Sequence, residues 1–91
     1  MDVSEVLKFM REIVRDRRAL PEAIGSLQQL VWKEPLTGSS AVQEILRELA
    51  YDLEYYEPDP RARAEDSSFY DDERAIAEIE EAITRIERAK Q

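Results

Sequence analysis

The chain has no cysteine and no histidine among its 91 residues. Without cysteine there is neither a disulfide nor a thiolate metal site, which is typical of a reducing compartment. Without histidine the commonest general base and a common zinc ligand are also missing. Because only carboxylates, hydroxyls and amines remain for chemistry, we expect a protein that is not an enzyme and that uses no cofactor or metal.

Long hydrophobic runs are absent as well. No stretch approaches the roughly 18 consecutive apolar residues of a transmembrane helix, and the opening MDVSEVLKFMREIV has no basic leader before an apolar run. The polar faces of the expected helices are mostly acidic, whereas helices that lie on a membrane usually carry Lys and Arg. We therefore expect a cytoplasmic protein without a membrane partner.

Acidic residues are in excess, and the excess lies in the second half of the chain. Residues 1–45 hold seven acidic and six basic side chains, whereas residues 46–91 hold fourteen and seven, for a net charge of −8. Such a surface repels nucleic acid and attracts a basic protein. The charge pattern thus favours a basic protein partner over nucleic acid.

Four segments place apolar residues at three- and four-residue intervals, and no segment alternates as a strand does. We predict a single helical domain over residues 1–91, with helices at about 3–18, 21–33, 40–56 and 72–89 and an acidic linker over 57–71. A turn is expected over 35–39, and Ser40 with Gln43 is expected to cap the third helix. The predicted fold class is all-α, an antiparallel four-helix bundle.

Three apolar features leave alternatives open. Ile76, Ile79, Ile83 and Ile86 repeat at a spacing that fits a bundle core but also a coiled-coil seam, so a homodimer is the alternative to a monomer. Gly25 costs its helix ~1 kcal/mol relative to alanine, and it marks either a close helix crossing or a tolerated imperfection. Trp32 is expected in the core or at its edge.

The stretch YDLEYYEPDP, residues 51–60, places acids at the end of the third predicted helix. A helix C-terminus carries partial negative charge, so acids there have the unfavourable sign. Residues 51–73 hold nine acids and five of the chain's seven aromatic residues. Tyrosine is enriched at protein interfaces, so the pattern predicts a protein-binding surface. The candidate binding residues are Asp52, Glu54, Tyr55, Glu57, Asp59, Asp71 and Asp72.

Two other interpretations of this region were weighed. Tyr56, Phe69 and Tyr70 are expected to pack the linker onto the bundle rather than to bind a partner. A metal site fits poorly, because bundle di-metal sites use a Glu-x-x-His motif and a calcium loop needs a central glycine that residues 59–73 lack. The acids are therefore expected to act through their charge.

Over residues 53–88 the chain resembles the bacterial colicin-D-type immunity proteins. The resemblance lies in LEYYEPDP followed by FYDDERAIAEIEEAITRIE, which match a Glu-x-aromatic-Glu-Pro-Asp element, a Tyr-containing linker, an Asp-Asp start and a final amphipathic helix. The matching positions are Glu54, Tyr56, Glu57, Pro58, Asp59, Tyr70, Asp71 and Asp72. Before residue 40 the resemblance rests on helix number and pattern, and the linker is a few residues longer than in the colicin D member.

The resemblance implies both a fold and a function. Members of this family are small, acidic, four-helix proteins that protect a cell from a tRNA-cleaving toxin. The acidic end of their third helix enters the basic catalytic cleft of the toxin in place of RNA phosphates. By resemblance, Glu54 and Asp59 would be the central carboxylates, and the partner would be a basic nuclease domain. The alternative is a structural or regulatory helical module that self-associates or binds another protein through an apolar helix face.

Overall fold

Helices make up most of the chain. The computed structural model describes residues 2–33 and 38–89. The four main helices are α1 (Val3–Arg15), α2 (Leu20–Lys33), α3 (Ser40–Asp52) and α5 (Asp72–Ala89), and two single-turn helices, η1 (Leu53–Tyr55) and α4 (Pro60–Arg63), lie between α3 and α5. Apart from an isolated bridge between Tyr56 and Tyr70, the described ranges contain no β-structure. The prediction of an all-α class is confirmed.

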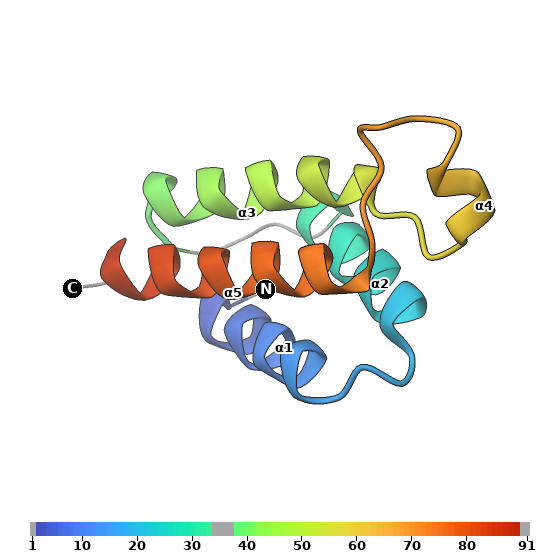
Figure 1. Ribbon diagram of the computed structural model, residues 1–91. Helices are drawn as coiled ribbons and strands as arrows, with labels where there is room; N and C mark the ends of the chain where they lie inside the picture. The colour runs from blue at the N-terminus through green and yellow to red at the C-terminus, as the bar shows by residue number, and fades with distance from the viewer. Residues whose placement is uncertain (1, 34–37, 90–91) are drawn as a thin grey trace.

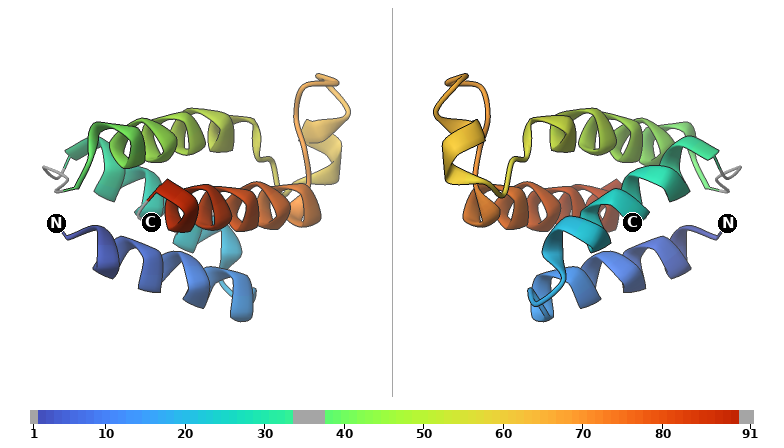
Figure 2. Two further views of the ribbon diagram at one scale, coloured as in Figure 1. Left: turned by 90° about the vertical axis from the view of Figure 1, so that its left-hand side faces the viewer. Right: turned by 90° about the vertical axis from the view of Figure 1, so that its right-hand side faces the viewer.

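The four main helices pack against one another. α1 contacts α2 and α5, and α3 contacts the same two helices. Figure 1 shows α3 and α5 side by side and running in opposite directions. In Figure 2, α5 lies between α3 and α1. The segment that carries η1 and α4 protrudes at the end of the molecule where α3 ends and α5 begins (Figure 1).

The apolar stripes of the four helices meet in one core. On α5, Ile76, Ile79 and Ile86 are at most 2% exposed, so these residues of the predicted stripe are buried within the single chain. Val14, Leu30 and Ile83, which share the three- and four-residue spacing of the stripes, are only partly buried. The buried residues of the other helices are Val3, Val6, Leu7, Met10, Ile13, Leu20, Ile24, Leu27, Val31, Val42, Ile45, Leu46, Leu49, Ala50 and Leu53.

The predicted bounds of the first helix were too long. α1 ends at Arg15 instead of residue 18, because Asp16 takes an extended backbone conformation. The side chain of Asp16 then binds Arg18, with Nη2 of the arginine 2.8 Å from Oδ2. This contact lowers the pKa of the Asp16 carboxyl to about 2, chiefly through the hydrogen bond from the Arg18 side chain.

The start of α3 also differs from the prediction. Ser39 rather than Ser40 is the N-cap, and its Oγ accepts a hydrogen bond from the backbone nitrogen of Val42 at 3.2 Å. Gln43 reaches back from α3 and donates from Nε2 to the carbonyl oxygen of Gly38 at 3.1 Å. In the turn predicted over 35–39, residues 35–37 lie outside the described residues.

The end of α3 departs most from the prediction. The α-helix stops at Asp52 rather than at residue 56, and the chain tightens into η1. The cause lies in the linker: Tyr70 donates its backbone N–H to the carbonyl of Tyr55, and Glu57 donates its N–H to the carbonyl of Tyr70, both at 2.9 Å. These bonds need an extended backbone at Tyr56, which a continuing helix does not allow.

The acidic linker contains a short helix that was not predicted from the sequence. Pro60 opens α4, and Asp59 caps it by accepting a hydrogen bond from the backbone nitrogen of Arg61 at 3.0 Å. Proline suits a first helical turn and aspartate suits an N-cap, so this turn follows from its own sequence. In the described ranges, every helix is too short or too polar to cross a membrane.

Candidate functional site

Two tyrosines attach the linker to the bundle. The hydroxyl of Tyr70 donates to the backbone oxygen of Asp52 at 2.7 Å, and the hydroxyl of Tyr56 donates to Oδ1 of Asp72 at 2.6 Å. Partial burial, together with these carboxylates, raises the pKa of both phenols. Both rings pack against the core, so the packing role predicted for Tyr56 and Tyr70 is confirmed. The third aromatic residue, Phe69, is partly buried.

Glu54 and Tyr55 project from this anchored end. Glu54 is exposed, and among the described residues it has neither a hydrogen bond nor an ion pair through its carboxylate. Tyr55 is 47% exposed. η1 explains their position: its tight turn follows the last turn of α3, and Leu53 alone of its three residues is buried. The carboxylate of Glu54 therefore meets only solvent.

The carboxylates of Glu57 and Asp59 form no ion pair with Arg63 of the same segment. Nη1 of Arg63 donates to the carbonyl oxygens of Glu57 at 2.8 Å and Pro58 at 3.3 Å. Its guanidinium therefore holds the backbone of the turn. Asp59 is exposed and caps α4, while Oε2 of Glu57 accepts a long hydrogen bond, 3.4 Å, from the backbone nitrogen of Asp59. Neither carboxylate forms an ion pair among the described residues, and the charges of Arg61 and Arg63 balance theirs over residues 57–63.

Asp71 and Asp72 stand at the N-terminus of α5, where negative charge is favourable. Oδ1 of Asp71 accepts from the backbone nitrogen of Arg74 at 3.1 Å and so caps the helix. Asp72 opens the helix and accepts the hydroxyl of Tyr56. Both side chains are exposed but already have structural roles. Of the seven candidates, Glu54 and Tyr55 are the ones whose side chains have no such role.

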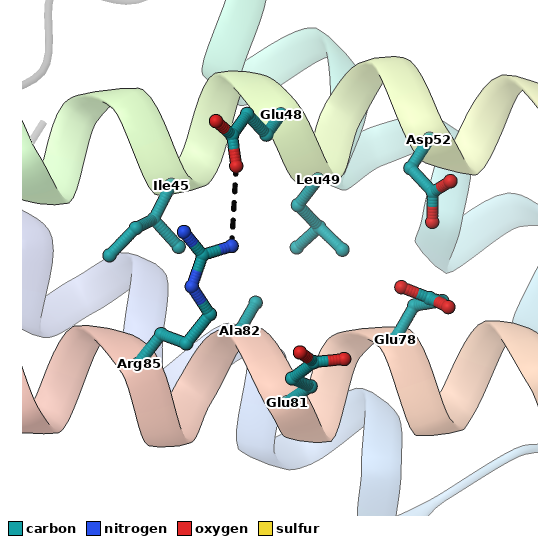
Figure 3. A pocket seen from close by; sticks show the side chains of 8 residues that line it. All are labelled: Ile45, Glu48, Leu49, Asp52, Glu78, Glu81, Ala82 and Arg85. Atoms are coloured by element: carbon teal, nitrogen blue, oxygen red, sulfur yellow. Dashed lines mark hydrogen bonds and ion pairs between the residues drawn. The ribbon is translucent and has the colours of Figure 1, made fainter.

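Asp52 faces away from Glu54, into a groove between α3 and α5. Figure 3 shows its carboxyl directed toward Glu78 of α5, with Glu48, Glu81 and Arg85 farther along. The groove encloses about 260 Å³. Arg85 closes one part of it through an ion pair with Glu48, whose N–O distance is 3.2 Å. The structure thus separates Asp52 from the other predicted site residues.

Asp52 shares its surroundings with a second acid. Burial raises the pKa of the Asp52 carboxyl, and the nearby Glu78 raises it further. Arg74 relieves part of this repulsion, since its Nε lies 2.7 Å from Oε1 of Glu78. Within residues 2–33 and 38–89, no three acidic side chains are placed to hold a metal ion. Acidic side chains of α3 and α5 therefore face each other across this groove without forming a metal site among the described residues.

A second groove lies on the other side of Glu54, against α2. Pro21, Gly25 and Trp32 line it from α2, and Glu54 and Pro58 line it from the opposite wall; the groove encloses about 460 Å³. Trp32 is 41% exposed and is not among the residues that pack against the core, so the prediction of a position in the core or at its edge was wrong. Its ring lies against Tyr51 of α3, with the ring centroids 6.0 Å apart and the planes at 53°.

The position of Gly25 is explained by this groove. A Cβ atom built on Gly25 would have no atom within 4 Å apart from its own helix and chain neighbours, so the glycine does not mark a close helix crossing. Pro21, Gly25 and Trp32 stand four and seven residues apart, which places them on one face of α2. This spacing was visible in the sequence, but nothing in the sequence indicated that the face lies beside Glu54.

Comparison of the chain with protein-family models, with curated proteins and with solved structures finds no match.

Proposed function

We propose that this protein is an immunity protein, a cytoplasmic antiparallel four-helix bundle that binds the basic catalytic domain of a toxin nuclease and blocks its RNA-binding cleft. The nuclease would be of the tRNA-cleaving kind that the resemblance over residues 53–88 suggests. The protein performs no chemistry itself. It presents carboxylates where the substrate presents phosphates.

One observation carries the proposal. The carboxylate of Glu54 stands at the negative end of α3 with no cationic partner among the described residues, and Arg63 of the linker is bound to backbone carbonyls. Negative charge at a helix C-terminus costs about 0.3–1 kcal/mol. Carboxylates paired with a cation across a desolvated interface can contribute about 1.5–7 kcal/mol of coupling. Binding of a cationic site can therefore outweigh the local penalty.

The rigidity of the anchored end also supports the proposal. The hydroxyls of Tyr56 and Tyr70, the cap at Asp59 and the guanidinium of Arg63 together fix the backbone on both sides of Pro58. Because this backbone is already fixed, binding orders only the side chains of the segment, and the cost of ordering its backbone is avoided. The exposed ring of Tyr55 beside it is the kind of side chain found at interface hot spots.

The alternative, a helical module that associates through the isoleucine stripe of α5, finds less support. Ile76, Ile79 and Ile86 are buried within the single chain, so this stripe offers no apolar seam to a second copy. The two proposals also differ in their salt dependence. An electrostatic complex associates more slowly as ionic strength rises, whereas apolar association hardly responds.

The test measures binding of the purified protein to basic domains of tRNA-cleaving toxins. Glu54→Gln removes one charge from the proposed surface, and Asp59→Asn removes another while keeping a residue that caps α4 equally well. Glu44→Gln is the matched control, because it removes an exposed charge on α3 about 15 Å from Glu54. We expect at least a tenfold loss of affinity for each site variant and less than a twofold change for the control. Equal affinities for all four proteins would refute the proposed surface.

A further inference from the structure

The groove between α2 and the segment 53–58 has the chemistry of a binding site for one cationic, planar side chain. Glu54 is the charged residue that lines it, and Trp32 contributes an exposed indole to the same groove. An arginine guanidinium forms hydrogen bonds with a carboxylate and stacks on an aromatic face. The two groups thus offer the two contacts that arginine makes best.

The α2 wall of the groove includes a glycine that adds no side chain to it. Gly25 lines it, and a methyl group at this position would contact nothing outside its own helix. Alanine would therefore fit and would make the helix more stable by about 0.5–1 kcal/mol. Neither the backbone conformation nor close packing requires a glycine at this position. Its structural effect is to leave space on this face of α2. That space lies beside Glu54 and Trp32.

The charged lining of the groove favours a cation, because Glu54 is the charged residue in it. The C-terminal end of α3 carries partial negative charge, and Glu22 of α2 lies close enough to Tyr56 to raise the pKa of its phenol. Arg63 lowers the pKa of the same phenol more strongly than Glu22 raises it, and its guanidinium is held at the carbonyls of Glu57 and Pro58, outside the lining of the groove. No lysine or arginine is among the described residues that line the groove.

We infer that this groove receives an arginine side chain of the protein partner, with the guanidinium between the carboxylate of Glu54 and the ring of Trp32. The identity of the occupant rests on the proposed function, because the arginine would come from the basic nuclease domain. The ring of Tyr51 on α3 contacts the indole of Trp32. The inference adds α2 to the binding surface, which the acidic residues of 52–72 alone do not include.

The groove is tested first without any partner. Trp32 is the single tryptophan of the chain, so its indole N–H gives one reporter signal in a ¹H–¹⁵N NMR spectrum. Acetyl-arginine amide is titrated against the protein, with acetyl-citrulline amide as the uncharged probe of nearly the same shape. We expect saturable shifts of the indole signal with arginine, with a Kd on the order of 10 mM for one cation–π contact and one exposed ion pair. Equal shifts with citrulline would overturn the inference.

Three variants assign the binding to the groove. Gly25→Leu fills the groove from α2 and should abolish the saturable shift, while Ser26→Leu adds the same side chain on α2 outside the lining and should leave it unchanged. Glu54→Gln should weaken arginine binding at least threefold. This variant tests the groove even if Gly25→Leu does not fold. An unchanged Kd in either Gly25→Leu or Glu54→Gln would show that arginine binds elsewhere.

The toxin-binding and arginine-binding assays together distinguish a failure of the groove proposal from a failure of the proposed function. If toxin domains bind the protein but Gly25→Leu binds them with unchanged affinity, the groove has no part in recognition and the immunity function stands. If arginine occupies the groove but no toxin domain binds, the groove is confirmed as a guanidinium site and the nuclease proposal fails. If both assays respond to Gly25→Leu and not to Ser26→Leu, the partner inserts an arginine here.

Discussion

The two glycines of the chain should respond in opposite ways to replacement by alanine. At Gly25 the backbone is helical and the added methyl group meets no atom within 4 Å, so the substitution carries no steric cost. Alanine gains helix propensity and loses conformational freedom in the unfolded chain, which together contribute about 0.5–1 kcal/mol. For a domain of this size, that gain raises Tm by about 3–6 °C.

Gly38 is the internal comparison for this prediction. Its φ of +120° is strained for any residue with a side chain, and an added Cβ would lie 2.7 Å from Cγ2 of Val3. Gly38→Ala should therefore lower the free energy of unfolding by more than about 1 kcal/mol. Urea and thermal unfolding, followed by circular dichroism at 222 nm, measure both variants. A loss of stability in Gly25→Ala would refute the view that this glycine serves only to leave space.

Three further substitutions test the anchored end and the acidic groove. Glu54→Lys should leave the helical spectrum intact and raise the free energy of unfolding by a few tenths of a kcal/mol at low salt, because it removes an unfavourable charge from the end of α3; a cooperative loss of structure would show that Glu54 is structural. Tyr70→Phe removes the hydrogen bond to the carbonyl of Asp52 and should cost about 0.5–1.5 kcal/mol in urea unfolding, with a neutral effect contradicting the anchor. Asp52→Asn tests the raised pKa of Asp52. The folded protein favours the protonated form of this carboxyl. Its contribution to the free energy of unfolding is therefore present below pH ~4 and is lost as pH rises through the raised pKa. The free energy of unfolding is measured for both proteins at pH 3.5 and pH 7. Relative to the wild type, the asparagine variant should be more stable at pH 7 than at pH 3.5. The same difference in stability at both pH values would refute a raised pKa for Asp52.

The helical part of the fold was predictable because it depends on local pattern. Apolar residues at three- and four-residue spacing identified all four main helices, and Ile76, Ile79 and Ile86 of α5 are buried as that spacing requires. The helix ends were less predictable because they depend on contacts between distant residues. α3 stops at Asp52 because the backbone of Tyr70, eighteen residues later, pairs with Tyr55 and Glu57. No local signal in residues 52–56 marks that stop.

The candidate site was predictable in composition but not in arrangement. The segment 51–73, which carries these acids and tyrosines, lies at one end of the molecule (Figure 1). Asp52 and Glu54 are two residues apart, yet one faces α5 and the other faces α2. That division follows from the tightening of the chain into η1. Trp32 and Gly25 lie at the site because α2 packs against α3, and the sequence did not indicate that contact.

The most direct test of the proposed function is a competition assay with the substrate of the toxin. The rate of tRNA cleavage by a toxin domain that binds this protein is measured at several tRNA concentrations and at several concentrations of the protein. If the carboxylates around Glu54 occupy the place of RNA phosphates, the apparent inhibition constant rises linearly with tRNA concentration while the maximal rate is unchanged. An inhibition constant that is independent of tRNA concentration would contradict occupation of the cleft.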